Sequence, residues 1–301
     1  MVEVCGFNDW LLEMLKNFRC QRIVVVQPED SDKRKTDRRD AAKLSELLWL
    51  YKDKIKNKEH IEKLKIVQTP SAVEQQLRRL TVLRKDARVQ RTRAINKVRN
   101  ILRKHNLQHD LPTKSFPSKA ALKWVKTLKL SPAERLELEL AVEDLHLHEL
   151  RVDRIDAAIT ELSKHDEDTQ ILAKTPGIAL FSSVALSSRI AGIGRFKRPR
   201  ALSNYFGLTP GCRNSGEKKD RLGRITKAGS PIARWVLGQA SKHVLRNDPQ
   251  LRAWFKKLKR KRGSKIARVA VMRRMTTIIW HMLTKRRTWA EVRAMGLGMK
   301  D

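Results

Sequence analysis

Two short apolar runs near the N-terminus have the pattern of buried strands. Val2–Val4, with Glu3 between two valines, has the pattern of the end of a strand. Ile23–Val26 is a continuous β-branched run of the kind found in strands buried on both faces. The apolar residues between the runs recur at helical spacing: Trp10, Leu11, Met14, Leu15 and Phe18. The pattern predicts a strand, a helix and a parallel strand. Because two strands do not make a stable sheet, the others come from a partner or from a part of the domain that this sequence lacks.

A charged segment follows, and the pattern begins the next helix at Thr36 or Asp37. The apolar face expected for this helix comprises Ala41, Leu44, Leu47 and Leu48. Asp37 and Asp40 are three residues apart, so both carboxylates lie on one face of the first turn. Such carboxylates complement the helix dipole. They can also hold Mg²⁺ together with a third carboxylate, and Glu3, at a strand end, is the candidate for it.

The middle of the chain predicts two long helices joined by a connector that contains prolines. The first spans about residues 71–106 and is basic, and the second spans about residues 132–164 and is acidic. The apolar face expected for the second helix comprises Leu136, Leu140, Leu147, Leu150, Ile155, Ala158, Ile159 and Leu162. We expect an antiparallel hairpin or a two-stranded coiled coil. In the alternative interpretation, the basic helix follows a nucleic-acid backbone.

From residue 171 the pattern changes to shorter helices separated by glycines. A Pro176-Gly177 turn precedes an apolar helix, as in the hairpin of a helix-hairpin-helix motif, whose backbone N–H groups receive a DNA phosphate. Gly177 is therefore a candidate nucleic-acid-binding residue. A plain packing unit of two helices and a turn is the alternative.

The connector at residues 208–229 is rich in glycine and in basic residues. Glycine lets a backbone approach another molecule closely, and basic side chains attract phosphate. The candidate phosphate-binding residues are Arg213, Lys218, Lys219, Arg221, Arg224 and Lys227. Ser230 is expected to cap the next helix, whereas capping does not account for Ser215, whose hydroxyl could attack a phosphodiester. The alternative is a solvated loop between two helices.

Composition favours a nucleic-acid partner. The 301 residues include 66 Lys and Arg against 32 Asp and Glu, for a net charge of +34, and so basic a surface binds polyanions. The cations are spread over the whole chain, which disfavours a membrane anchor, and no apolar stretch approaches the ~18 residues of a membrane span. The three cysteines have no metal-ligand spacing. We expect a cytoplasmic protein.

Several short motifs occur in a fixed order along the chain: VEVCGFNDWL, KTDRRDA, TPGI, YFGLTP, NSG and ITKAG. In this order they resemble the DEDD-type insertion-sequence transposases, from Glu3 to about Trp289. The resemblance implies a mainly α fold with a partial α/β, RuvC/RNase H-like N-terminal unit at residues 1–68. It further implies a long helical hairpin or coiled coil at 69–168 and a helical serine transposase domain at 169–301, which contains the helix-hairpin-helix-like segment.

The resemblance also implies roles for individual residues. Glu3, Asp37 and Asp40 match acids that hold Mg²⁺ and take part in catalysis, and Ser215 matches the serine that forms a covalent link to DNA. A further aspartate of the family lies upstream of the glutamate and has no counterpart here, so we expect an N-terminally truncated chain.

The function expected from the resemblance is that of a transposase, a recombinase that acts on element ends and target DNA. A guide RNA and a dimer or tetramer of the chain are the further partners that it implies. The alternatives are a nucleic-acid-binding protein without catalytic activity and an inactive, truncated transposase.

Overall fold

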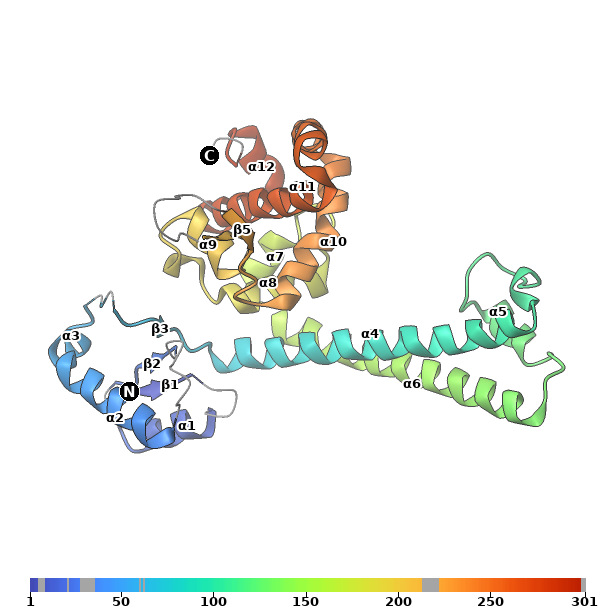
Figure 1. Ribbon diagram of the computed structural model, residues 1–301, viewed down its shortest axis with the longest axis horizontal. Coiled ribbons are helices and arrows are strands. Elements are labelled where there is room, and N and C mark those ends of the chain that lie inside the picture. Colours follow the sequence, from blue (N-terminus) through green and yellow to red (C-terminus); the bar gives the residue numbers. More distant parts are fainter. Residues whose placement is uncertain are drawn as a thin grey trace. The chain divides into compact units, whose positions relative to one another are not determined.

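The chain is mainly helical and divides into two compact units, Met1–Pro70 and Ser71–Asp301 (Figure 1). The computed structural model describes residues 1–4, 9–20, 22–27, 36–59, 61, 63–212 and 222–298. The predominance of helix was predicted from the sequence and is confirmed. No helix in these ranges is long and apolar enough to cross a membrane.

The first unit is built on a small three-stranded sheet. Strands β1 (Val2–Glu3) and β2 (Val25–Val26) are parallel, and α1 (Asp9–Asn17) lies between them in the sequence, which confirms the predicted order of strand, helix and strand. Strand β3 (Ile66–Val67) pairs with β2 in the antiparallel direction. Strand β3 was not predicted, because Ile66 and Val67 stand between Lys65 and Gln68 and do not extend into an apolar run like Ile23–Val26.

The helices of this unit pack only lightly. Val24 and Val26 form a small core with Ile55 of α3 (Lys52–Lys56) and with Ile61. Helix α2 (Asp37–Leu50) begins where the sequence predicts, but it contains no buried residue. Leu44 is partly buried against the core and Leu48 is 39% exposed, so the apolar face predicted for this helix is not a buried face.

The second unit begins with an antiparallel helical hairpin (Figure 1). Helix α4 (Ala72–Lys104) packs along α6 (Pro132–Ser163), and the turn η1 (Leu107–His109) and α5 (Lys119–Val125) lie between them in the sequence. The hairpin confirms the expectation of two paired helices. Its basic and acidic members are linked by three ion pairs: Arg84–Asp156, Arg91–Glu149 at 2.7 Å, and Lys97–Asp144 at 3.6 Å.

The buried face of α6 differs from the predicted one. Five leucines that were expected in the core are exposed: Leu136, Leu140, Leu147, Leu150 and Leu162. Leu138 and Leu145 are buried instead, and Ile159 is buried as predicted. The prediction was wrong because this helix carries leucines on two faces, and periodicity alone does not tell which face α4 covers.

The remaining elements form the C-terminal region of this unit. In chain order they are α7 (Glu167–Leu172), α8 (Leu180–Ile190), η2 (Ile193–Arg195), α9 (Pro199–Tyr205), β4 (Pro210–Cys212), β5 (Leu222–Ile225), α10 (Pro231–Asn247), α11 (Pro249–Lys285) and α12 (Trp289–Ala294). Helix α11 is interrupted at Gly263, which has a φ of 81° and a ψ of 164°.

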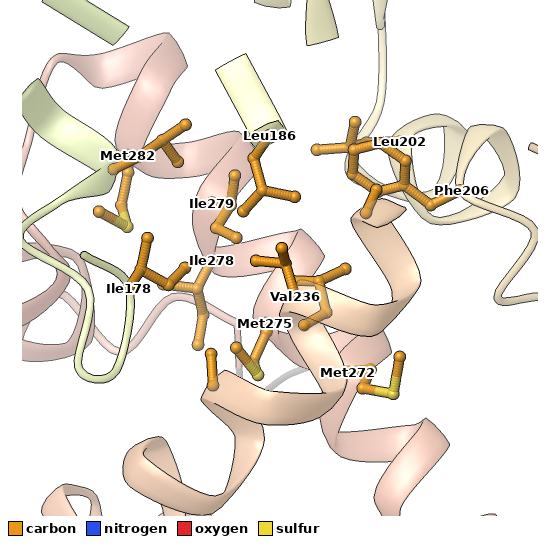
Figure 2. Packing of buried hydrophobic residues seen from close by; sticks show 14 of the residues in the cluster. Ile178, Leu186, Leu202, Phe206, Val236, Met272, Met275, Ile278, Ile279 and Met282 are labelled. Atoms are coloured by element: carbon orange, nitrogen blue, oxygen red, sulfur yellow. The ribbon is translucent and has the colours of Figure 1, made fainter. Parts of the chain in front are cut away.

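A hydrophobic core joins helices α8 to α11 (Figure 2). Leu186 of α8 and Leu202 of α9 lie in the same cluster as Val236 of α10 and Ile279 of α11. Phe206, directly after α9, is completely buried there. This core holds the chain rigidly on both sides of the connector at residues 208–229, because α9 precedes the connector and α10 follows it.

Candidate functional site

The glycine-rich connector forms a β-hairpin. Strands β4 and β5 are antiparallel, with Pro210 opposite Ile225 and Cys212 opposite Leu222. The loop between the strands, residues 213–221, lies outside the described residues. The candidate nucleophile Ser215 falls there, as do four candidate phosphate-binding residues: Arg213, Lys218, Lys219 and Arg221. The structure therefore describes the two strands and the flanking helices that support the predicted site.

Two glycines close the base of this hairpin. Gly207 has a φ of +66°, and a Cβ there would lie 2.3 Å from the carbonyl oxygen of Ala228. Gly229 has a φ of +116°, and a Cβ there would lie 2.1 Å from the carbonyl oxygen of Tyr205. Only glycine permits both this backbone conformation and so close an approach. These two glycines thus allow the two ends of the hairpin to pack against each other.

Arg234 of α10 links the two ends of the hairpin. Its guanidinium donates hydrogen bonds to the carbonyl of Phe206 at 3.1 Å and to the carbonyl of Gly229 at 2.9 Å. The helix that carries it starts at Ser230, whose hydroxyl accepts a hydrogen bond from the N–H of Ala233, as predicted. The role of Arg234 could not be predicted from the sequence, because one arginine in a first turn gives no signal of distant carbonyl partners.

Two of the predicted phosphate-binding residues lie in the described part of the hairpin. Arg224 is in β5 and Lys227 follows that strand, and both side chains are exposed. Neither side chain has an ion-pair partner among the residues that the structure describes. They are thus available to an external anion beside the loop that carries Ser215.

Gly177 has a structural role in its turn. Its φ is +79°, and a Cβ there would lie 2.5 Å from the Cβ of His243 in α10. The turn therefore packs closely on α10. The following helix, α8, is a core helix with residues 183–190 buried. This packing accounts for the glycine without a ligand, and its predicted contact with nucleic acid stays a prediction, as does the helix-hairpin-helix assignment.

An arginine cluster joins α4 to the C-terminal end of α8. The carbonyl of Arg189 accepts hydrogen bonds from Arg78 at 3.4 Å, from Arg195 at 3.0 Å and from the Tyr205 hydroxyl at 3.0 Å. Cations there complement the negative end of the helix dipole. These donors provide hydrogen bonds for the carbonyl at the end of α8. The bond from Arg78 also connects the hairpin of α4 and α6 to the region that carries the candidate site.

The Arg189 side chain is itself buried and points back to α4. It donates hydrogen bonds to the Thr81 hydroxyl at 3.1 Å and to the carbonyl of Ala185 at 3.0 Å. Burial, reinforced by repulsion from Arg78, lowers the pKa of the Arg189 guanidinium to about 10. A buried cation with neutral partners is expected to contribute more to the geometry of this junction than to its stability.

The predicted acidic site lies in the first unit. Glu3 is at the end of β1, and Asp37 and Asp40 are in the first turn of α2, as predicted. Three carboxylates are suitable ligands for Mg²⁺. However, no group of three or more His, Cys, Asp or Glu side chains in the described ranges is placed to hold a metal ion. The metal site stays a prediction, and we derive no chemistry through it.

The chain is strongly basic and mainly helical, and its C-terminal region holds a β-hairpin whose two strands are joined by a segment with one serine and four cations in its sequence. Residues 169–256 match the model of the transposase IS116/IS110/IS902 family. The matched segment contains the whole hairpin together with α9 and α10, which hold its base. The similarity to this transposase family thus falls on the part of the chain that holds the hairpin.

Curated relatives extend the similarity beyond that domain. The chain is 26% identical over 231 residues to the transposase for insertion sequence element IS1111A of Coxiella burnetii, an alignment that covers 75% of this chain and 63% of the relative. It is 27% identical over 235 residues to the putative transposase y4qE of Sinorhizobium fredii, which covers 75% of this chain and 53% of the relative. The chain thus spans less than two thirds of the length of these relatives.

Proposed function

We propose that this chain is a DNA transposase of an insertion sequence, which cuts and rejoins DNA through a covalent link to Ser215. The family match over residues 169–256 carries the proposal, because it includes the hairpin on which Ser215 lies. The relatives named as transposases and the net charge of +34 support it. A chain so basic is suited to a polyanionic substrate.

The proposed reaction consists of two transesterifications. The Ser215 oxygen attacks the phosphorus of a phosphodiester and loses its proton to a base or to water. The bond from phosphorus to one deoxyribose oxygen breaks, and that oxygen leaves as a hydroxyl. A deoxyribose hydroxyl then attacks the phosphoserine and releases Ser215. One phosphodiester is exchanged for another, so the covalent intermediate divides the exchange into two steps and needs no external energy source.

The basic residues of the loop would hold the phosphate during these steps. Arg213, Lys218 and Lys219 flank Ser215 in sequence, and charge-assisted hydrogen bonds to phosphate are among the stronger ones. Arg221, Arg224 and Lys227 would contact neighbouring phosphates. The closed base of the hairpin, with Arg234 across it, supplies the rigid support that a positioned nucleophile requires.

The proposal includes Mg²⁺ as cofactor, with Glu3, Asp37 and Asp40 as its ligands, because carboxylates are the ligands that Mg²⁺ prefers. It also includes DNA as substrate, a guide RNA and a dimer or tetramer of the chain. These parts rest on the resemblance of the ordered motifs, and the RuvC-like fold of the first unit rests on it as well.

Trapping of the covalent intermediate tests the proposal. The chain is incubated with Mg²⁺, labelled element-end DNA and the element's RNA, and adducts are separated on a denaturing gel. We expect an adduct with the wild type and none with Ser215→Ala. Ser264→Ala, at an exposed position in α11, is the matched control and should leave the adduct intact. An adduct that persists in Ser215→Ala contradicts the serine assignment, and DNA binding without any adduct favours a non-catalytic binding protein.

A further inference from the structure

A second basic surface lies next to the hairpin. An open pocket of about 490 Å³ is lined by Lys197, Arg198, Arg200, Ala201, Asn204, Thr209 and Pro210. Its first wall is the start of α9, and its second wall is the start of β4, only a few residues before the loop that carries Ser215. Its volume falls in the range of ligand-binding pockets.

The charge of this pocket is uncompensated. Three of its lining residues are cations, and none is acidic. Lys197, Arg198 and Arg200 are exposed, and within the described ranges their side chains make neither hydrogen bonds nor ion pairs. Arg224 and Lys227, across the hairpin from Thr209 and Pro210, add further positive charge. Uncompensated cations in a concave surface attract an anion.

The pocket is built on a rigid support. Leu202 of α9 and the following Phe206 and Leu208 are completely buried in the core. The Thr209 hydroxyl donates a hydrogen bond to the side-chain oxygen of Asn204 at 2.8 Å, which links the two walls. With its oxygen so engaged, the side-chain amide N–H₂ of Asn204 is left to donate to a ligand. Helix α9 is thus fixed on its core side, and the three cations lie at and just before its first turn.

We propose that this pocket binds the phosphodiester backbone of the DNA strand that runs to the Ser215 loop. This inference rests on the proposed function. Phosphate contacts fix the register of a protein on nucleic acid without reading its sequence. Lys197, Arg198 and Arg200 are therefore positioning residues that set which phosphate reaches the loop. The open shape suits a passing strand better than an enclosed small anion.

Binding of a labelled element-end duplex to the full chain, measured by fluorescence anisotropy over a range of salt concentrations, tests this inference. Arg198→Ala/Arg200→Ala should weaken binding about tenfold and reduce the slope of log K against log salt by about 1 to 2, because phosphate contacts are lost. Arg198→Lys/Arg200→Lys should retain most of the affinity. Both changes are at exposed positions, and unchanged thermal unfolding confirms the fold.

The matched control is Arg103→Ala/Lys104→Ala, which removes the same charge from exposed positions at the end of α4. Equal losses in the control and in the pocket variant overturn the inference, since total charge alone would then explain them. If the wild type binds no DNA, the proposed function fails as well, whereas a pocket variant that binds like the wild type contradicts this inference alone.

Discussion

Single residues decide how closely the backbone packs around the candidate site. Gly207 and Gly229 let the two ends of the hairpin meet, and Gly177 lets the turn before α8 rest on α10. All three have positive φ values, which disfavour any residue with a Cβ. The geometry around the loop therefore depends on the absence of side chains as much as on contacts.

Gly177→Ala should lower the free energy of unfolding by more than Gly192→Ala does. Both glycines have a left-handed φ, which costs an alanine about 1 kcal/mol. A Cβ at Gly177 would also meet His243, whereas nothing lies within 4 Å of one at Gly192, so overpacking adds about 1–3 kcal/mol at Gly177 alone. Urea denaturation measures both, and equal losses would contradict the packing role.

Arg234→Ala should reduce formation of the DNA adduct more than it reduces stability. Loss of the bonds to Phe206 and Gly229 releases the hairpin base, while the half-exposed position limits the loss of unfolding free energy to about 1–2 kcal/mol. Rates of adduct formation and urea denaturation are measured on the same preparations. An unchanged adduct rate would show that the hairpin base does not position Ser215.

Stability should rise with pH in the range where Arg189 loses its proton. Burial lowers the pKa of this guanidinium to about 10 in the folded chain, so between pH 10 and its higher, ordinary pKa the unfolded state binds more protons. The stability difference between wild type and Arg189→Met should be flat below about pH 9. It should then rise by up to about 1.4 kcal/mol per pH unit above pH 10. Urea denaturation at several pH values measures it, and a flat or falling difference would contradict the lowered pKa.

The pairing of helices α4 and α6 determines which of their apolar residues become buried. Helices α4 and α6 pair along their length through three ion pairs and through apolar residues on facing sides. Half-exposed ion pairs contribute little to stability. The apolar contacts between the two helices therefore supply most of the free energy that stabilises this hairpin, while the ion pairs favour one alignment of the two helices.

Leu145→Ala and Leu147→Ala compare the two faces of α6 directly. Leu145 is fully buried and Leu147 is 45% exposed. The first substitution should cost about 2–5 kcal/mol of unfolding free energy and the second less than about 0.5 kcal/mol. Chemical denaturation of the full chain measures both. A larger loss at Leu147 would favour the face predicted from the sequence over the face in the structure.

Most helices could be predicted from the sequence because their signals are local. Ser71 caps α4 in a capping box, Pro132 stands at the first position of α6, and Ser230 caps α10, all within one turn of the residues they affect. The covered face of α6, strand β3 and the carbonyl partners of Arg234 and Arg189 could not be predicted. Each depends on segments that are distant in sequence and meet only in the folded chain.

In the molecule as a whole, most of the excess positive charge lies in the second unit, which holds 51 Lys and Arg against 20 Asp and Glu, whereas the first unit holds 15 against 12. The net charge of +34 makes counterion release the expected driving force for nucleic-acid binding. The expectation of an anionic partner could be drawn from composition. The pocket at Lys197, Arg198 and Arg200 could not, since its concave shape arises only where α9 and β4 meet.

Nucleic-acid binding by the whole chain should weaken steeply with salt. The logarithm of the binding constant should fall linearly with the logarithm of salt concentration, with a slope of about −0.9 for each phosphate contacted in a duplex. Fluorescence anisotropy with duplex DNA in a salt titration measures the slope. A salt-independent affinity would contradict an interface built on phosphate contacts.

Peptide mapping of the trapped adduct tests whether Ser215 itself becomes covalently linked to DNA. Trypsin cleaves after Arg213 and Lys218, so it releases the peptide Asn-Ser-Gly-Glu-Lys, in which Ser215 is the only hydroxyl residue. After nuclease digestion of the DNA, mass spectrometry should find this peptide with a nucleotide attached through a phosphate. A nucleotide found on any other peptide, with this one unmodified, would contradict the covalent role of Ser215.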